Sequence, residues 1–177
     1  MTFHEQRAVE LFRQGCNCSQ AVFTAFSDVT GIEEKTALRM SSSFGGGLGR
    51  LREVCGAVSG MSLAAGILWG YDDLSDKSLK TEHYALVAGM AHKFSDIFGS
   101  YICREILGIP NYKYSPEAED RTAEYYLKRP CEKCIAAAAR ILDEEIEKRK
   151  CYNKKPSLYG FLFFSVLCDT LSADILP

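Results

Sequence analysis

Residues 55–69 read CGAVSGMSLAAGILW, and this stretch decides the predicted fold. It is apolar on most sides of a helical projection, which is typical of a helix at the centre of a protein. Its small residues Gly56, Ala57, Gly60 and Ala64 would let a neighbouring helix pack closely. Each glycine inside a soluble helix costs roughly 1 kcal/mol relative to alanine. We therefore expect a packing or functional reason for these glycines.

The segments around this stretch repeat apolar residues at spacings of three and four, whereas strand-like alternation is nearly absent. In the helix predicted at 76–98, the side chains expected to face the protein core are those of Leu86, Val87, Met90, Phe94, Ile97 and Phe98. Residues 111–119 are typical of a loop. The other helices are predicted at 5–12, 18–29 (ended by Gly31), 33–43, 101–107 and 131–149. The sequence thus predicts an all-α, single-domain bundle of about six to seven helices.

The chain has 177 residues, of which 47% are hydrophobic and 25% charged, with a net charge of −2. This balance gives no electrostatic argument for binding nucleic acid. The apolar run at 159–167 is far shorter than the roughly 18 residues that span a bilayer. No secretory signal is visible, so we expect a cytoplasmic protein without a membrane span. Residues 1–150 are predicted to form the helical domain that holds the cysteine site, and 151–177 an apolar tail that packs on it or on a partner subunit.

Eight cysteines are the strongest chemical signal of the sequence. In a reducing cytoplasm, thiols more often bind metal or do redox work than form structural disulfides. Four of them stand at or near predicted helix beginnings, where free backbone N–H groups and the helix dipole stabilise a thiolate. These four are Cys18, Cys55, Cys103 and Cys131. Nearby basic residues are Arg52, Arg104, Arg129 and Lys133. Cys151 and Cys168 are expected only to pack in apolar surroundings.

Two short motifs pair cysteines along the chain. In Cys131-Glu132-Lys133-Cys134 the sulfurs share one helix face, so they could form a disulfide, ligate one metal or merely pack among alanines. The surroundings are helical, which argues against a thioredoxin fold. In Cys16-Asn17-Cys18 the pair could chelate a soft metal, although Cys18 also begins an apolar helix face.

The stretch Phe44-Gly45-Gly46-Gly47-Leu48-Gly49-Arg50 is expected to be a flexible connector beside the central helix, because glycine permits positive φ and close backbone approach. It lacks the Gly-Lys-Ser/Thr ending of a phosphate-binding loop and does not fit a dinucleotide-binding pattern.

Taken together, these segments resemble a bacterial and archaeal family of redox-active proteins named for its cysteine pattern, C_GCAxxG_C_C. The resemblance covers roughly residues 5–147. It is carried by 15–22, 44–50, Cys55-Gly56-Ala57-Val58-Ser59-Gly60, 98–99 with 103–108, and Cys131 before its alanine-rich helix. It implies a redox role, with the four characteristic cysteines at Cys18, Cys55, Cys103 and Cys131. Cys134 competes with Cys131 for the last position, and the spacing to the following alanines favours Cys131.

Three hypotheses follow. In the first, Cys18, Cys55, Cys103 and Cys131 gather at one site and undergo thiol–disulfide exchange or electron transfer, with Arg50 as an electrostatic partner. The chain would then be a thiol-dependent oxidoreductase that exchanges electrons with a redox partner protein. In the second, the same four thiols bind zinc or an iron–sulfur cluster. In the third, the cysteines only pack and the chain is an interaction module. The apolar tail at 151–177 would then form the contact between the subunits of a homodimer.

Overall fold

The computed structural model of the chain describes residues 1–153, and the side chains of residues 1–150. These residues contain nine α-helices, one short 3-10 helix and no strand, so the all-α prediction is confirmed. None of the described helices is both long and apolar enough to cross a membrane. The helices are α1 (Phe3–Arg13), α2 (Cys18–Ala25), α3 (Ser27–Thr30), α4 (Glu34–Ser41), η1 (Ser42–Phe44), α5 (Gly56–Trp69), α6 (Lys77–Phe98), α7 (Cys103–Ile106), α8 (Ala123–Lys128) and α9 (Cys131–Asn153).

The chain divides into two compact units, Met1–Leu142 and the residues from Asp143 onward. The predicted tail at 151–177 lies outside the residues whose side chains are described, so its packing stays a prediction. All the features that follow belong to the first unit, which includes the first turns of α9.

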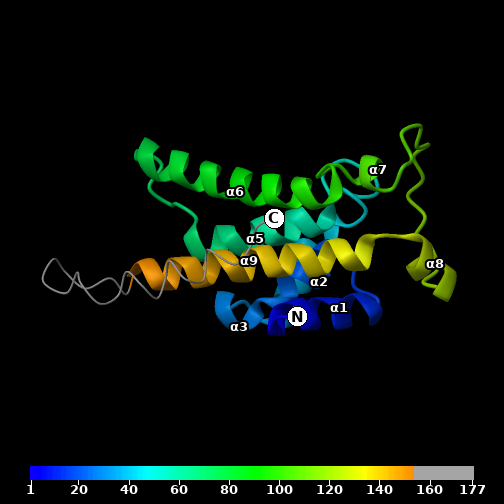
Figure 1. The fold of residues 1–177 in the computed structure, drawn as a ribbon, viewed down its shortest axis with the longest axis horizontal. Helices are drawn as coiled ribbons and strands as arrows, with labels where there is room; N and C mark the ends of the chain where they lie inside the picture. Colours follow the sequence, from blue (N-terminus) through cyan, green and yellow to red (C-terminus); the bar gives the residue numbers. More distant parts are fainter. Residues whose placement is uncertain (154–177) are drawn as a thin grey trace, which may run out of the picture. The chain divides into compact units, whose positions relative to one another are not determined.

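Helix α5 packs against α2 and α6 (Figure 1). Its buried residues are Gly56, Ala57, Val58, Gly60, Met61, Ala64 and Ala65. A Cβ added at Gly60 would lie 2.6 Å from the carbonyl oxygen of Ser19, on the backbone of α2. The two helix backbones therefore approach as closely as a glycine allows, which is the packing reason expected for this residue. Gly66, in contrast, has nothing within 4 Å of an added Cβ.

Three details differ from the prediction. The helix expected at 18–29 is broken at Phe26 (φ −100°, ψ 19°), whose buried ring stacks on His4 with centroids 4.2 Å apart. Helix α8 was not expected; the Thr122 hydroxyl caps it by accepting from the Tyr125 N–H at 3.2 Å. On α6 only Met90 and Phe94, one turn apart, are buried, and Ile97 in the last turn is half exposed, because α6 packs along a narrow stripe.

Candidate functional site

Each of the four cysteines selected from the sequence stands at a helix beginning. Cys18, Cys103 and Cys131 are the first residues of α2, α7 and α9, and Cys55 is the N-terminal cap of α5. For the longer helices α2, α5 and α9, this places a sulfur at the end where backbone N–H groups are free and the dipole is positive.

A pair of short backbone contacts brings the start of α7 to the start of α5. Val54 and Ile102 form an isolated antiparallel bridge. The Cys55 N–H donates to the Tyr101 carbonyl at 2.8 Å, and the Cys103 N–H donates to the Glu53 carbonyl at 2.6 Å. Two cysteines 48 positions apart in the sequence are thereby held on neighbouring segments.

The start of α2 is brought to the same place by a glycine. A Cβ added at Gly56 would lie 3.1 Å from the Cβ of Cys18 and 3.2 Å from the Ser19 nitrogen. The Asn17 side chain caps α2 by accepting from the N–H groups of Ser19 and Gln20, each at 3.0 Å. Its amide also donates to the Ser42 carbonyl at 2.9 Å, which fixes the beginning of α2 against the loop after α4.

Five thiols line one cavity of about 320 Å³. They belong to Cys18, Cys55, Cys103, Cys131 and Cys134. All five are free thiols; Cys55, Cys103 and Cys134 are buried, whereas Cys18 and Cys131 are partly exposed. Cys16 does not line the cavity, although it is close in sequence to Cys18. Cys151 and Cys168 lie outside the described side chains.

Cys18 and Cys131, which we name the outer pair, differ sharply in acidity. The Cys18 thiol donates a hydrogen bond that lowers the pKa of Cys131 to about 7, against the effect of burial and with the help of Arg129, Arg52 and Arg121. The same hydrogen bond, together with burial, raises the pKa of Cys18 well above its ordinary value. The pair therefore holds one thiolate and one thiol near neutral pH.

Cys55 and Cys134, the inner pair, repeat this arrangement deeper in the protein. A hydrogen bond from the Cys134 thiol lowers the pKa of Cys55 against burial, with further help from the backbone N–H groups of Ala57 and Val58. The pKa of Cys134 is raised by the same hydrogen bond and by burial. The first turn of α5 thus favours the ionised form of Cys55, as expected for a sulfur at a helix cap.

Cys103, the fifth thiol, is also less acidic than an ordinary cysteine. Burial and the neighbouring Cys55 charge raise its pKa to about 11, while Arg52 acts in the opposite direction. Arg52 was singled out from the sequence as a neighbour of Cys55, but its guanidinium contacts the Cys103 thiol. The fold therefore places Arg52 beside Cys103, a cysteine that is distant from it in the sequence.

A cluster of arginines lies beside the sulfurs. Glu119 binds Arg50 at 3.0 Å and Arg52 at 3.2 Å, and forms a third ion pair with Arg129. Although burial acts to raise the pKa of Glu119, these guanidinium groups hold it below its usual value. Arg50, the predicted electrostatic partner, lines the cavity and also donates to the Ser115 carbonyl at 3.0 Å.

The glycine-rich stretch before α5 is a hydrogen-bonded turn, which corrects the expectation of a flexible connector. The N–H groups of Arg50, Arg52 and Glu53 donate to the carbonyls of Gly45, Gly46 and Gly47 at 3.0–3.2 Å. Three residues other than glycine have positive φ here: Leu48, Arg50 and Arg52. Each residue held in this backbone conformation costs on the order of 1–3 kcal/mol in strain. Strained residues of this kind cluster at functional sites.

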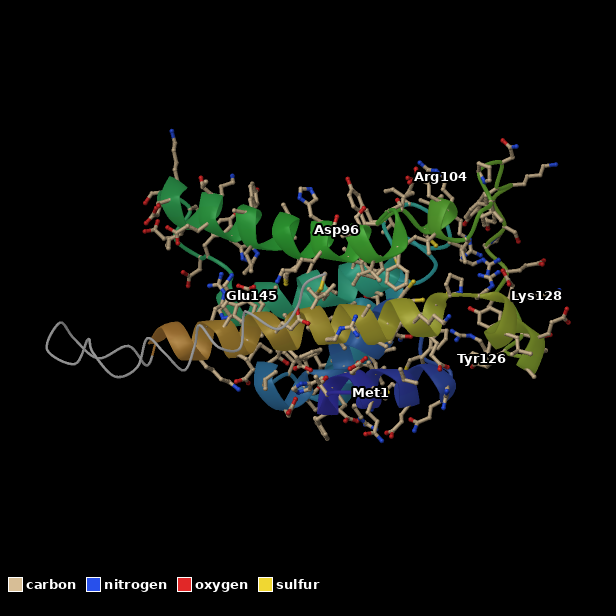
Figure 2. The ribbon with its side chains drawn as sticks, viewed as in Figure 1. Met1, Asp96, Arg104, Tyr126, Lys128 and Glu145 are labelled. Atoms are coloured by element: carbon tan, nitrogen blue, oxygen red, sulfur yellow. The ribbon has the colours of Figure 1, made fainter. Side chains whose placement is uncertain are left out.

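Glu119 and Arg121 were missed from the sequence, because a charged residue in a polar loop looks the same whether it faces solvent or a cavity. Arg121 donates to the Cys16 carbonyl at 3.1 Å and lies over the rings of Phe12 and Tyr125. The adjacent α8 is attached to α1 by Tyr126, labelled in Figure 2, whose ring meets Phe12 edge-to-face at 5.5 Å.

The chain is similar to a described protein family and to an archaeal protein. Residues 16–145 match the family described as "Putative redox-active protein (C_GCAxxG_C_C)". An uncharacterized protein of Archaeoglobus fulgidus is 24% identical over 155 residues, which cover 82% of this chain and 95% of that protein. No solved structure matches the chain. Because the matched region includes all five thiols of the cavity, the chain belongs to the C_GCAxxG_C_C family of redox-active proteins.

Proposed function

We propose that the chain reduces a substrate disulfide through the outer pair. The Cys131 thiolate attacks one substrate sulfur, and the other substrate sulfur leaves as a thiolate. Cys18 then gives up its proton to that leaving thiolate and attacks the Cys131 sulfur, which releases the second substrate sulfur as a thiolate and forms a Cys18–Cys131 disulfide. The substrate gains two electrons and one proton from the outer pair, and the second substrate thiolate takes its proton from water.

One observation carries this proposal: the two thiols of the outer pair line one cavity and have opposite pKa shifts, each of which has the other thiol as its largest cause. Exchange is fastest when the attacking thiol has a pKa near the ambient pH, and Cys131 meets this condition. A resolving thiol with a high pKa stays protonated until the mixed disulfide has formed. Cys18 and Cys131 are also the two partly exposed residues among the five cavity cysteines, which favours them as the pair that meets a substrate.

The inner pair supplies a second dithiol behind the first. Cys55 is close enough to Cys131 for the charge of one to affect the other. Exchange between the pairs would move two electrons inward or outward without an added oxidant: the inner pair forms a disulfide as the outer disulfide is reduced. The buried position of Cys134 suits a sulfur that reacts with its neighbours rather than with the substrate.

A metal centre is the second candidate, favoured by the convergence of five thiols on one cavity. Zinc and iron–sulfur clusters take four thiolates, and Cys18, Cys55, Cys103 and Cys131 would be the ligands. Among the described side chains of residues 1–150, however, no three of His, Cys, Asp or Glu are grouped as ligands of one ion. The largest influence on the pKa of Cys131 is Cys18, and that on the pKa of Cys55 is Cys134, so a pairwise reaction such as thiol exchange is the better-supported one. Metal analysis and an absorption spectrum after anaerobic purification separate the two.

Cytoplasmic location, a redox partner protein and a homodimer stay predictions, and each is compatible with thiol exchange. The interaction-module hypothesis differs, because it predicts cysteine-to-serine variants that keep stability and every measurable partner.

Replacement of the resolving thiol tests the proposal. With Cys18→Ser, the reaction with oxidised glutathione is expected to accumulate the mixed disulfide, because the resolving thiol is gone and only the buried Cys55 is left to displace the glutathione slowly. Mass spectrometry of the intact protein and its peptides should find glutathione on Cys131. The matched control is Cys16→Ser, which changes a thiol two residues away that does not line the cavity and should leave turnover intact. A Cys18→Ser protein that turns over at the normal rate, or carries glutathione only elsewhere, would overturn the proposed order of attack.

A further inference from the structure

The cavity around the thiols carries more positive charge than its own carboxylate can balance. Four guanidinium groups line it, and among the described lining residues Glu119 is the only acidic side chain. Glu119 is shared by three arginines. The fourth, Arg121, has no carboxylate partner among the described residues. The four arginines are Arg50, Arg52, Arg121 and Arg129.

Two of these arginines have buried nitrogen atoms that have no hydrogen-bond partner among the described residues 1–150. They are Nε of Arg52, a residue only 3% exposed, and Nη1 of Arg121. A buried donor without an acceptor costs about 1–3 kcal/mol, and more when it is charged, so native proteins rarely leave one unsatisfied. Both atoms belong to side chains that line the same cavity. An acceptor entering the cavity would satisfy them.

Both guanidinium groups are held in place before any ligand arrives. Arg52 lies over the Tyr112 ring at 5.0 Å and donates to Glu119. Arg121 lies 4.6 Å from the Phe12 centroid and 5.0 Å from the Tyr125 centroid. A planar guanidinium fixed in this way presents its N–H groups as a fork, the geometry that matches the oxygens of carboxylates and of phosphate-like anions.

We propose that the cavity binds a small substrate through a compact oxyanion group, with Arg52 Nε and Arg121 Nη1 as donors, next to the outer pair. This assignment rests on the proposed function, because it names the substrate class of the same thiols. The group would be either a free inorganic oxyanion or the carboxylate of a small anionic disulfide. The excess of guanidinium charge also lets such an anion approach a site where Cys131 is itself negative.

Sulfate, an oxyanion that does not react with thiols, is the direct probe. The reduced full-length protein is titrated with sulfate at constant ionic strength, and the Nε–H signals of its arginines are followed by NMR. We expect a saturable shift of the Arg52 signal and an affinity at least tenfold lower in Arg121→Gln. Arg121→Lys keeps the charge but loses the fork, and should also bind more weakly. Arg39→Gln, on the exposed surface of α4, is the matched control and should leave the affinity unchanged.

The second arm compares three alkyl disulfides that differ mainly in charge: 3,3′-dithiodipropionate, 2-hydroxyethyl disulfide and cystamine. The wild-type protein should reduce the anionic one fastest, and Arg121→Gln should lose that preference. A saturable sulfate shift without this preference would assign the cavity to a free oxyanion. If sulfate produces no saturable shift and charge has no effect on rate, the inference is wrong, while disulfide formation in the same samples would leave the proposed function standing. Sulfate binding needs no redox step, so failure of the thiol chemistry would be seen separately.

Discussion

Replacement of Cys131 by serine is expected to lower the rate of disulfide reduction by about 100-fold or more, because a hydroxyl group near neutral pH cannot replace a thiolate nucleophile. The other four cavity thiols cannot take over the first attack efficiently. Cys18 and Cys134 have raised pKa values, the pKa of Cys103 is about 11, and Cys55 is buried. The measurement is the rate of reduction of 2-hydroxyethyl disulfide with a regenerating reductant.

The pH profile of the wild-type protein provides a signature for this role. The folded pKa of Cys131 is lowered to about 7, so its thiolate is present above that pH and is lost as the pH falls through it. The rate should therefore rise with pH and level off above neutrality, and fall about tenfold per unit in the acid range. In Cys131→Ser this inflection should disappear. A merely structural role would change the rate without moving the inflection.

Cys16→Ser again supplies the control, since it removes one partly exposed thiol outside the cavity. The assignment of Cys131 would be contradicted if both variants kept the wild-type rate, or if Cys16→Ser caused the larger loss.

Replacement of Gly60 by alanine is expected to lower the free energy of unfolding by about 2 kcal/mol and the melting temperature by roughly 4–8 °C. The new Cβ would lie 2.6 Å from the Ser19 carbonyl oxygen and 3.1 Å from the Cβ of Val22. The atoms in the way belong partly to the backbone of α2, so they cannot rotate aside. Helix α2 must move away from α5, and Cys18 would move with it, so thiol exchange should weaken as well.

Gly66→Ala is the matched control on the same helix. Nothing lies within 4 Å of an added Cβ at this position. Alanine has the higher helix propensity, so this variant should be more stable by about 0.5–1 kcal/mol. Thermal unfolding followed by circular dichroism measures both variants. Equal effects of the two substitutions would show that close approach of α2 and α5 is not what Gly60 provides.

The positions of the cysteines along the helices could be predicted from sequence, because they depend on local signals. The apolar periodicity of the predicted helices placed Cys18, Cys55, Cys103 and Cys131 at or near helix beginnings, and each is found there. The close packing of α5 against a neighbouring helix could also be predicted, because small residues in a central helix mainly allow close approach of another helix.

The pairing of the sulfurs could not be predicted, because it depends on how distant helices dock. The sequence grouped Cys131 with Cys134 as a C-x-x-C motif, whereas the hydrogen bonds join Cys131 to Cys18 and Cys134 to Cys55. Residues three apart on a helix point in similar directions, yet each can meet a different neighbouring helix.

The arginine cluster could not be predicted from the sequence for a related reason. Arg121 and Glu119 come from a polar loop with no periodic pattern, and only the tertiary structure shows that they face the cavity. The break at Phe26 was missed because the apolar spacing continues through it. The helix ends there because burial of the Phe26 ring is favoured over continuation of the helix.

The most direct test is to map disulfides in the wild-type protein across glutathione buffers of increasing redox potential, with rapid acid quenching and peptide mass spectrometry. We expect two links to form, Cys18–Cys131 and Cys55–Cys134, while Cys103 stays a free thiol. Thiols that remain unchanged over the whole range, or links that join Cys131 to Cys134, would contradict the paired-thiol site.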